Sequence, residues 1–253
     1  MKIIKKLKKV KSFLTDKEFA NAKNLSHVER LKSPVRTEII NFLLTLTDCN
    51  NYLEIGVRDP RNNFDKINCP NKYSVDPELE FKSNQVDFKY TSDEFFSKLK
   101  NNELKKIDNT IKFDVVFIDG LHISSQVEKD IINSMHYLKE NGFIVLHDCN
   151  PPTIHHQRED YQFINSPAGI LWNGTTWKAF YKFRHHKDFN SICFDTDWGV
   201  GVLTKRNLLS FNKLSETIDN NYFEYSILDE KRKQHLNLID FNYWKKELIN
   251  LNS

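Results

Sequence analysis

The chain has 253 residues, of which 39% are hydrophobic and 28% charged, and its formal net charge is +3. This size and composition indicate one α/β domain with additions, and the near-balanced charge argues against a nucleic-acid partner. No apolar run approaches the roughly 20 residues that span a bilayer, and the basic N-terminus lacks a signal-peptide pattern. We therefore expect a cytoplasmic protein.

The four cysteines show neither a CxxC pair nor a regular spacing. They are Cys49, Cys69, Cys149 and Cys193. This pattern favours reduced structural thiols over disulfides or a zinc site.

Residues 2–14 place apolar side chains at helical spacing among lysines, which predicts a basic amphipathic helix. Such a helix could lie on an anionic membrane or contact a partner. Alternatively, it packs its apolar face on the domain.

A second helix is expected from Ser33-Pro34, with Ser33 as the N-cap and Pro34 at the first helical position. Two short strands follow at residues 52–57 and 72–77, and residues 86–90 are a candidate third strand. Residues 91–94 have the pattern of a capping box at the start of a helix.

Residues 113–148 predict a strand, an amphipathic helix and a second strand. The helix places Val127, Ile131, Met135 and Leu138 on one face, and Asn141-Gly142 is the expected stop. Alternating strands and helices indicate βαβ units and a parallel sheet.

The pattern changes after Asp148. Residues 149–184 are rich in loop signals, with a helix expected over 179–183. Two β-type runs, 191–197 and 199–204, predict an antiparallel hairpin turning at Trp198-Gly199. Near the end, a helix is expected with Phe241, Trp244 and Leu248 on one face.

Two acids and a glycine mark a candidate nucleotide-type site. Glu54 and Gly56 end the first strand, and Asp76 follows the next strand 22 residues later. A glycine lets a ligand approach the backbone, and a second acid can bind ribose hydroxyls. Alternatively, Glu54-Ile55-Gly56 is an ordinary end of a buried strand.

A second group of polar residues follows the strands of the 113–148 unit. It comprises Asp119, His122, His147 and Asp148. Neighbouring parallel strands lie about 4.8 Å apart, so side chains at their ends can share one ion. His122 could act as a general base. In the alternative interpretation, Asp119 caps a helix and His147 is a hydrogen-bonded residue at a strand end.

Aromatic and histidine residues outside these motifs have less specific interpretations. Trp172 and Trp177 could line a sugar or aromatic acceptor, or could fix a loop to the core. His155-His156 are interpreted as loop residues and His185-His186 as surface residues.

Taken together, the motifs resemble those of class I S-adenosylmethionine-dependent methyltransferases. YLEIGV at 52–57, YSVDPE at 73–78, FDVVFIDGLH at 113–122 and NGFIVLHD at 141–148 are similar to four of their strand motifs. The hairpin at 191–205 is similar to their last two strands. Within that class, the DGxH and HD motifs resemble enzymes of glycan and polysaccharide biosynthesis and the metal-dependent macrocin-type sugar O-methyltransferases.

The resemblance implies a fold and domain limits. It implies a Rossmann-like α/β fold, with a parallel sheet, a C-terminal antiparallel hairpin, helices on both faces and an N-terminal helical extension. The expected divisions are 1–49 for the extension, 50–205 for the methyltransferase domain and 206–253 for a C-terminal helical tail.

The resemblance also implies roles for individual residues. Glu54 and Gly56 would lie by the methionine part of S-adenosylmethionine, Asp76 by its ribose, and Ser92 and Asp93 by its adenine. Asp119 and Asp148 would bind Mg²⁺ or Mn²⁺, and His122 would be the base. The sequence departs from the family at Arg58, where many members continue a glycine-rich loop. It departs again at His147, which stands where the sugar enzymes have a second acidic ligand. We nevertheless count His147 as a candidate metal ligand. Asp119 is also a candidate cofactor-binding and catalytic residue.

The expected function is O-methylation of a sugar, nucleotide sugar or glycan precursor. One alternative is a methyltransferase of the same fold that acts on another small molecule or an amine without metal. The other is a non-catalytic binding module on a degenerate fold. The sequence is compatible with a homo-oligomer and with a membrane or partner contact through the lysine-rich N-terminus.

Overall fold

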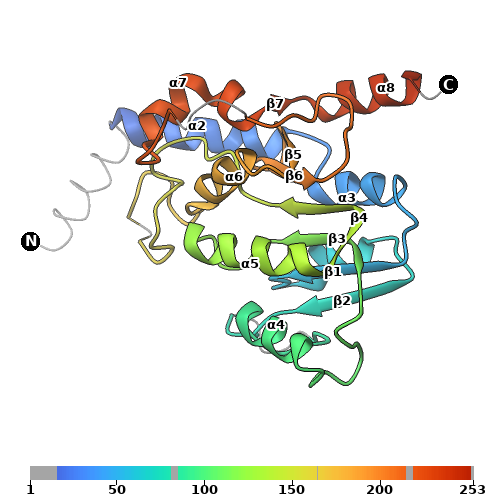
Figure 1. Cartoon of the computed structure of the whole chain (residues 1–253). Helices are drawn as coiled ribbons and strands as arrows, with labels where there is room; N and C mark the ends of the chain where they lie inside the picture. Colours follow the sequence, from blue (N-terminus) through green and yellow to red (C-terminus); the bar gives the residue numbers. More distant parts are fainter. Residues whose placement is uncertain (1–15, 81–84, 164, 215–218, 252–253) are drawn as a thin grey trace, which may run out of the picture.

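A seven-stranded sheet in the order β2-β1-β3-β4-β6-β5-β7 organises the protein (Figure 1). The computed structural model describes residues 16–80, 85–163, 165–214 and 219–251, so the helix predicted over 2–14 lies outside the described residues. The strands are β1 (Asn51–Ile55), β2 (Asn71–Val75), β3 (Phe113–Ile118), β4 (Leu138–Leu146), β5 (Asn190–Phe194), β6 (Val200–Thr204) and β7 (Leu238–Ile239).

Helices cover both faces of this sheet (Figure 1). The α-helices of the described residues are α2 (Lys17–Leu31), α3 (Arg36–Leu44), α4 (Ser92–Lys100), α5 (Ser124–Tyr137), α6 (Thr176–Arg184), α7 (Tyr225–Leu236) and α8 (Phe241–Leu251). One core joins side chains of α4, α5, α6 and α7 to the sheet. The other core joins side chains of α3 and α8 to the opposite face. The α/β architecture inferred from the sequence is confirmed.

Strand directions also agree with the sequence-based expectation. β1 pairs in parallel with β2 and β3, and β3 pairs in parallel with β4. β6 runs antiparallel to both β4 and β5, which confirms the predicted hairpin. The chain leaves β1 to form β2 on one side and returns to form β3 on the other. This reversal creates the switch point at which open α/β sheets bind ligands.

The predicted third strand is not formed as a strand. Its residues make one isolated parallel bridge, between Phe88 and Val75 at the end of β2. Asp87 explains part of this geometry, because its carboxylate accepts hydrogen bonds from the backbone and hydroxyl of Ser74. A side chain thus takes the place of further ladder bonds.

The predicted helix stop at Asn141-Gly142 is wrong. Helix α5 ends at Tyr137, and Asn141-Gly142 lies within β4. The pairing with β3 is irregular there, because Phe113 pairs with Leu138 whereas Val115 pairs with Phe143. A side chain at position 142 would lie 2.9 Å from the carbonyl oxygen of Asp114. The glycine therefore serves a β-bulge rather than a helix cap.

The predicted cap at Ser33-Pro34 is also wrong. Helix α3 begins at Arg36, and Val35 occupies the N-cap position without a side-chain hydrogen bond. The carboxylate of Asp197, from the β5–β6 turn, accepts a 2.8 Å hydrogen bond from the Arg36 backbone N–H. A residue remote in sequence therefore satisfies an amide that a local cap usually satisfies.

The segment after β6 contributes to the same sheet and core. β7 pairs in parallel with β5, and Phe241, Trp244 and Leu248 of α8 are buried as predicted. Arg184 connects this region to the sheet: its guanidinium donates to the carbonyl oxygens of Gln234 and His235 and to Ser191 Oγ. Among the described residues, no helix is both long enough and apolar enough to cross a membrane.

Candidate active site

The loops that follow the parallel strands meet at the carboxyl edge of the sheet, and they carry most of the predicted site residues. Asp119 follows β3 and His147-Asp148 follow β4. Because β6 runs antiparallel to β4, with Gly201 opposite Leu146, the β5–β6 turn lies at the same edge. The turn brings Asp197, which the sequence analysis did not select.

Asp119, His122 and Asp148 form one cluster. His122 Nε2 lies 3.2 Å from Asp119 Oδ1, and His122 Nδ1 lies 3.1 Å from Asp148 Oδ2. One donor atom from each residue lies within 4.8 Å of the other two. Burial opposes charge on the His122 ring, but Asp148 and Asp119 outweigh it and raise the pKa of His122.

His147 lies between the same two acids. Its Nδ1 is 3.1 Å from both Asp119 Oδ1 and Asp148 Oδ2, and its Nε2 is 3.4 Å from Asp197 Oδ1. Burial disfavours the charged ring, but Asp148 and Asp119 raise the pKa of His147 well above its usual value. The charges are reciprocal, since His147 and His122 hold the pKa of Asp119 well below its usual range despite its burial.

Arg36 also reaches this cluster. Its Nη1 lies 3.0 Å from Asp197 Oδ2, and its Nε lies 3.8 Å from Asp119 Oδ2. A helix that leads into a parallel strand begins at the carboxyl edge, and Arg36 is the first residue of α3. The position of Arg36 was therefore available from the order of elements, although its charge partners were not.

The 149–175 loop places an aromatic ring and an amide against the cluster. Trp172 stacks on His122, with 4.9 Å between ring centroids and 19° between planes. Asn173 is 1% exposed, and its Nδ2 donates a 2.7 Å hydrogen bond to Asp148 Oδ1. Its Oδ1 has no hydrogen-bond partner among the described residues. Trp177, by contrast, is fully buried in the core.

Backbone conformation at this edge is unusual. Asp148 has a φ of +61°, and Asp197 has a φ of +46°. Left-handed backbone is uncommon for residues other than glycine, although aspartate tolerates it better than most. Strained positions often occur at functional sites, where the surrounding structure holds them in place.

Glu54 and Gly56 are engaged by the protein itself. Glu54 Oε2 accepts hydrogen bonds from Tyr52 Oη at 2.6 Å and Asn63 Nδ2 at 2.8 Å. Burial is the main cause that raises the pKa of Glu54 to about 8. A Cβ at Gly56 would lie 2.3 Å from Gly120 Cα, so the absence of a side chain permits close packing of two strand ends.

Asp76 organises the loop after β1. Its Oδ2 accepts from the backbone N–H groups of Val57 and Arg58, each at 3.0 Å, and its Oδ1 accepts from Glu78 at 2.6 Å. A carboxylate offers about four acceptor positions. Three are used here, so one remains open.

Ser92 and Asp93 begin α4, which follows β2 and therefore starts at the carboxyl edge of the sheet. The predicted capping box between Thr91 and Glu94 is present. Gln126 Nε2 contacts Ser92 Oγ at 3.2 Å and Asp93 Oδ1 at 2.9 Å. This joins the start of α4 to α5.

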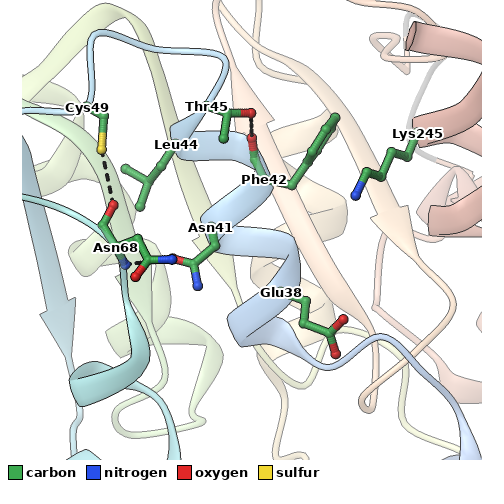
Figure 2. Close-up of a pocket in the computed structure, with 8 residues that line it drawn as sticks. All are labelled: Glu38, Asn41, Phe42, Leu44, Thr45, Cys49, Asn68 and Lys245. Carbon is green, nitrogen blue, oxygen red and sulfur yellow. Dashed lines mark hydrogen bonds between the residues drawn. The ribbon is translucent and has the colours of Figure 1, made fainter.

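Two further candidates lie away from the cluster. His156 is buried and hydrogen-bonded to Ser26 and Thr153, and burial lowers its pKa to about 4. A surface pocket of about 450 Å³ lies beside α3. The residues that line it include Phe42, Cys49 and Asn68 (Figure 2). Cys49 precedes β1 and Asn68 precedes β2, so this pocket lies at the amino ends of the strands.

Comparison with known proteins supplies the class. Residues 64–149 match a family model described as a methyltransferase domain. The match covers about a third of the chain and shows similarity to a methyltransferase domain over that segment. The matched segment includes Asp119, His122, His147 and Asp148, whereas Glu54 and Gly56 precede it. With the sheet order, this match makes the protein an enzyme with a class I methyltransferase fold.

Solved methyltransferase structures are similar to this one at low identity. An O-methyltransferase from Bacillus cereus in complex with SAH has 11% identity and a TM-score of 0.46; the match covers 76% of this chain and 94% of that one. The SAH-bound methyltransferase PaMTH1 from Podospora anserina has 12% identity and a TM-score of 0.44, with coverages of 76% and 88%. No curated protein matches the sequence.

Proposed function

We propose that this methyltransferase transfers the methyl group of S-adenosylmethionine to a hydroxyl of a sugar, nucleotide sugar or glycan precursor. The observation that carries the proposal is the cluster of one imidazole and two carboxylates at the carboxyl edge of β3 and β4. SAH-bound methyltransferases among the similar structures support the choice of cofactor. Asp76, with one acceptor position left, would bind its ribose.

The donor atoms suit a divalent cation. Oxygen ligands lie about 2.1 Å from Mg²⁺, so ligands on opposite sides of the ion are about 4.2 Å apart. The observed limit of 4.8 Å requires only a small contraction. The unpartnered Oδ1 of Asn173, beside Asp148, is a further oxygen in a position to be satisfied by an ion or its water. Asp119 and Asp148 would hold the cation, which would fix and acidify a sugar hydroxyl.

His122 would accept the proton of that hydroxyl. Asp119 and Asp148 flank its ring and stabilise the imidazolium that forms when the proton is transferred. Stacking on Trp172 fixes the plane of the ring. Correct alignment of the hydroxyl with the sulfonium methyl is the main requirement of this displacement, and fixed side chains lower its entropic cost.

A metal-free methyltransferase acting on another small molecule or an amine is a second candidate. The observation that favours it is the positive charge beside the acids. Arg36 lies near Asp119, and His147 lies near Asp119 and Asp148, so these side chains already balance the carboxylates without a cation. Methyl transfer that persists in excess EDTA would support this candidate over the metal-dependent one.

The test is transfer of a tritiated methyl group from S-adenosylmethionine to a panel of sugars and nucleotide sugars. We expect His122→Ala to lower turnover by roughly 10²- to 10⁴-fold, as loss of a general base does, with cofactor affinity nearly unchanged. His136→Ala, an exposed histidine of α5, should be fully active. Normal turnover by His122→Ala would remove His122 from the mechanism.

A further inference from the structure

His147 is contacted at both ring nitrogens by the protein. Nδ1 lies 3.1 Å from Asp119 Oδ1 and from Asp148 Oδ2. Nε2 lies 3.2 Å from Arg36 Nη1 and 3.4 Å from Asp197 Oδ1. Rotation of the ring would break contacts on both sides, so the imidazole has one orientation between the two acids and the Arg36–Asp197 pair.

Arg36 and Asp197 are themselves firmly connected. Arg36 Nη1 contacts both carboxylate oxygens of Asp197, at 3.0 and 3.2 Å, and the Arg36 backbone N–H donates to Oδ2 at 2.8 Å. Both side chains are largely buried, with 22% and 9% exposed. Buried, multiply bonded ion pairs of this kind hold geometry, and loss of one partner is costly.

Neighbouring contacts attach the whole β5–β6 turn to the segment before β1. Thr196 Oγ1 donates to the carbonyl oxygen of Pro34 at 2.8 Å, and Lys32 Nζ donates to Asp195 at 2.6 Å. Three successive residues of the turn, 195–197, therefore bind residues 32–36. A segment outside the matched methyltransferase family region reaches the active site in this way.

We propose that Arg36 and Asp197 clamp His147, and that His147 is a positioning residue for Asp119 and Asp148 rather than a metal ligand. The inference rests on the proposed metal-dependent function. His147 presents its Nδ1 edge to the two carboxylates, as His122 also does, but its Nε2 edge lies against the Arg36–Asp197 clamp, which fixes the ring as a support for the acids. Its role is to fix the two acids that hold the ion, as residues around metal ligands commonly do.

Manganese alone is the probe, measured by electron paramagnetic resonance on the full chain labelled with ¹⁵N-histidine. We expect His147→Gln to weaken Mn²⁺ binding by roughly 10- to 100-fold. At saturating Mn²⁺, any pulsed-resonance coupling from a directly bound histidine nitrogen should be the same in wild type and variant. A directly bound nitrogen that disappears in His147→Gln would overturn the proposal.

The variant Arg36→Met distinguishes loss of the clamp from a simple charge effect, because the two predict opposite changes in Mn²⁺ affinity. Removing a positive charge 3.8 Å from Asp119 should tighten Mn²⁺ binding if charge alone matters, whereas loss of the clamp should weaken it by about tenfold or more. Asp197→Asn should weaken it similarly, and Arg36→Lys should not restore it because lysine lacks the planar fork. Unchanged or tighter binding in Arg36→Met would overturn the clamp.

The matched control is Arg206→Met. Arg206 donates to the Leu46 carbonyl oxygen and lies over the Phe143 ring, at the other end of β4 and β6, so its variant should bind Mn²⁺ as wild type does. Failure of the wild-type protein to bind Mn²⁺ would overturn this inference. S-adenosylmethionine binding measured in the same preparation would then show whether the proposed methyl transfer fails with it.

Discussion

The pKa of Glu54, near the end of β1, depends strongly on the surroundings of its carboxyl group. It is 2% exposed, and burial raises its pKa to about 8. Its Oε2 accepts from Tyr52 and Asn63, and Asn63 in turn accepts from Thr37 of α3. The carboxyl group therefore joins β1, the loop after it and α3, at the start of which Arg36 enters the site.

This environment predicts a loss of stability as pH rises. The unfolded chain releases the Glu54 proton near the usual value of 4.5, whereas the folded chain keeps it to about pH 8. Stability should therefore fall between these values. Glu54→Gln should remove this contribution, with a gain over wild type on the order of 4 kcal/mol at pH 8 and little at pH 4.5. Urea unfolding across this range measures it; a difference independent of pH would contradict the assignment.

Prediction from sequence succeeded for residues whose place depends on one strand. Asp119, His122 and Asp148 follow buried strands directly, so their proximity could be expected from the parallel order. Arg36 and Asp197 could not be paired in this way, because their contact depends on how a helix before β1 meets a turn 161 residues later. The close contact of Trp172 with His122 likewise depends on the path of a long loop.

Among the elements of the fold, the close approach of β1 and β3 limits which residues can occupy the positions where these strands end. Gly56 has a φ of +83°, and its neighbour across the gap is the Asp119–Gly120 backbone. The sequence pattern indicated Gly56 as a place where a ligand approaches the backbone. The structure gives a packing reason, which connects the loop after β1 to the position of Asp119.

Gly56→Ala should destabilise the protein by roughly 2 kcal/mol or more. The cost combines a left-handed backbone with a contact of 2.3 Å that forces the two strand ends apart. Gly120→Ala is the matched control, since a Cβ there would make ordinary contacts of 3.7 Å or longer. Urea unfolding compares the two; equal stability of both variants would show that the strand ends separate freely.

The boundary between α5 and β4 shows why element ends are hard to predict. An Asn-Gly pair after an amphipathic run is a common helix stop, yet here it forms a bulge inside a strand. Local sequence is compatible with both outcomes. The choice depends on pairing with β3 and on the Asp114 carbonyl oxygen that fills the space beside Gly142.

At the scale of the molecule, the C-terminal segment completes the fold. β7 extends the sheet beside β5, and α8 covers the face formed by Phe194 and its neighbours. The segment expected as a C-terminal helical tail contributes side chains to both hydrophobic cores. Its weak hydrophobic pattern before residue 241 concealed the contribution of Leu228 and Leu236, both fully buried.

Trp244→Ala should therefore cost about 3–5 kcal/mol of folding free energy, as large deletions in a core do. Trp244 is 1% exposed, and its Nε1 donates to the Leu209 carbonyl oxygen. Tyr243→Ala, at a neighbouring exposed position, should change stability by less than about 0.5 kcal/mol. A mild effect of Trp244→Ala in chemical denaturation would show that the C-terminal segment is dispensable.

The proposed function requires the carboxyl edge of this sheet to bind S-adenosylmethionine beside the Asp119–His122–Asp148 cluster. Titration calorimetry with S-adenosylmethionine measures this binding. We predict saturable binding at one site, weakened about tenfold or more by Asp76→Asn, which removes charge-assisted hydrogen bonds. Asp188→Asn, on the surface away from the cluster, should bind as wild type does. The absence of measurable binding by the wild-type protein would rule out the proposed methyl transfer.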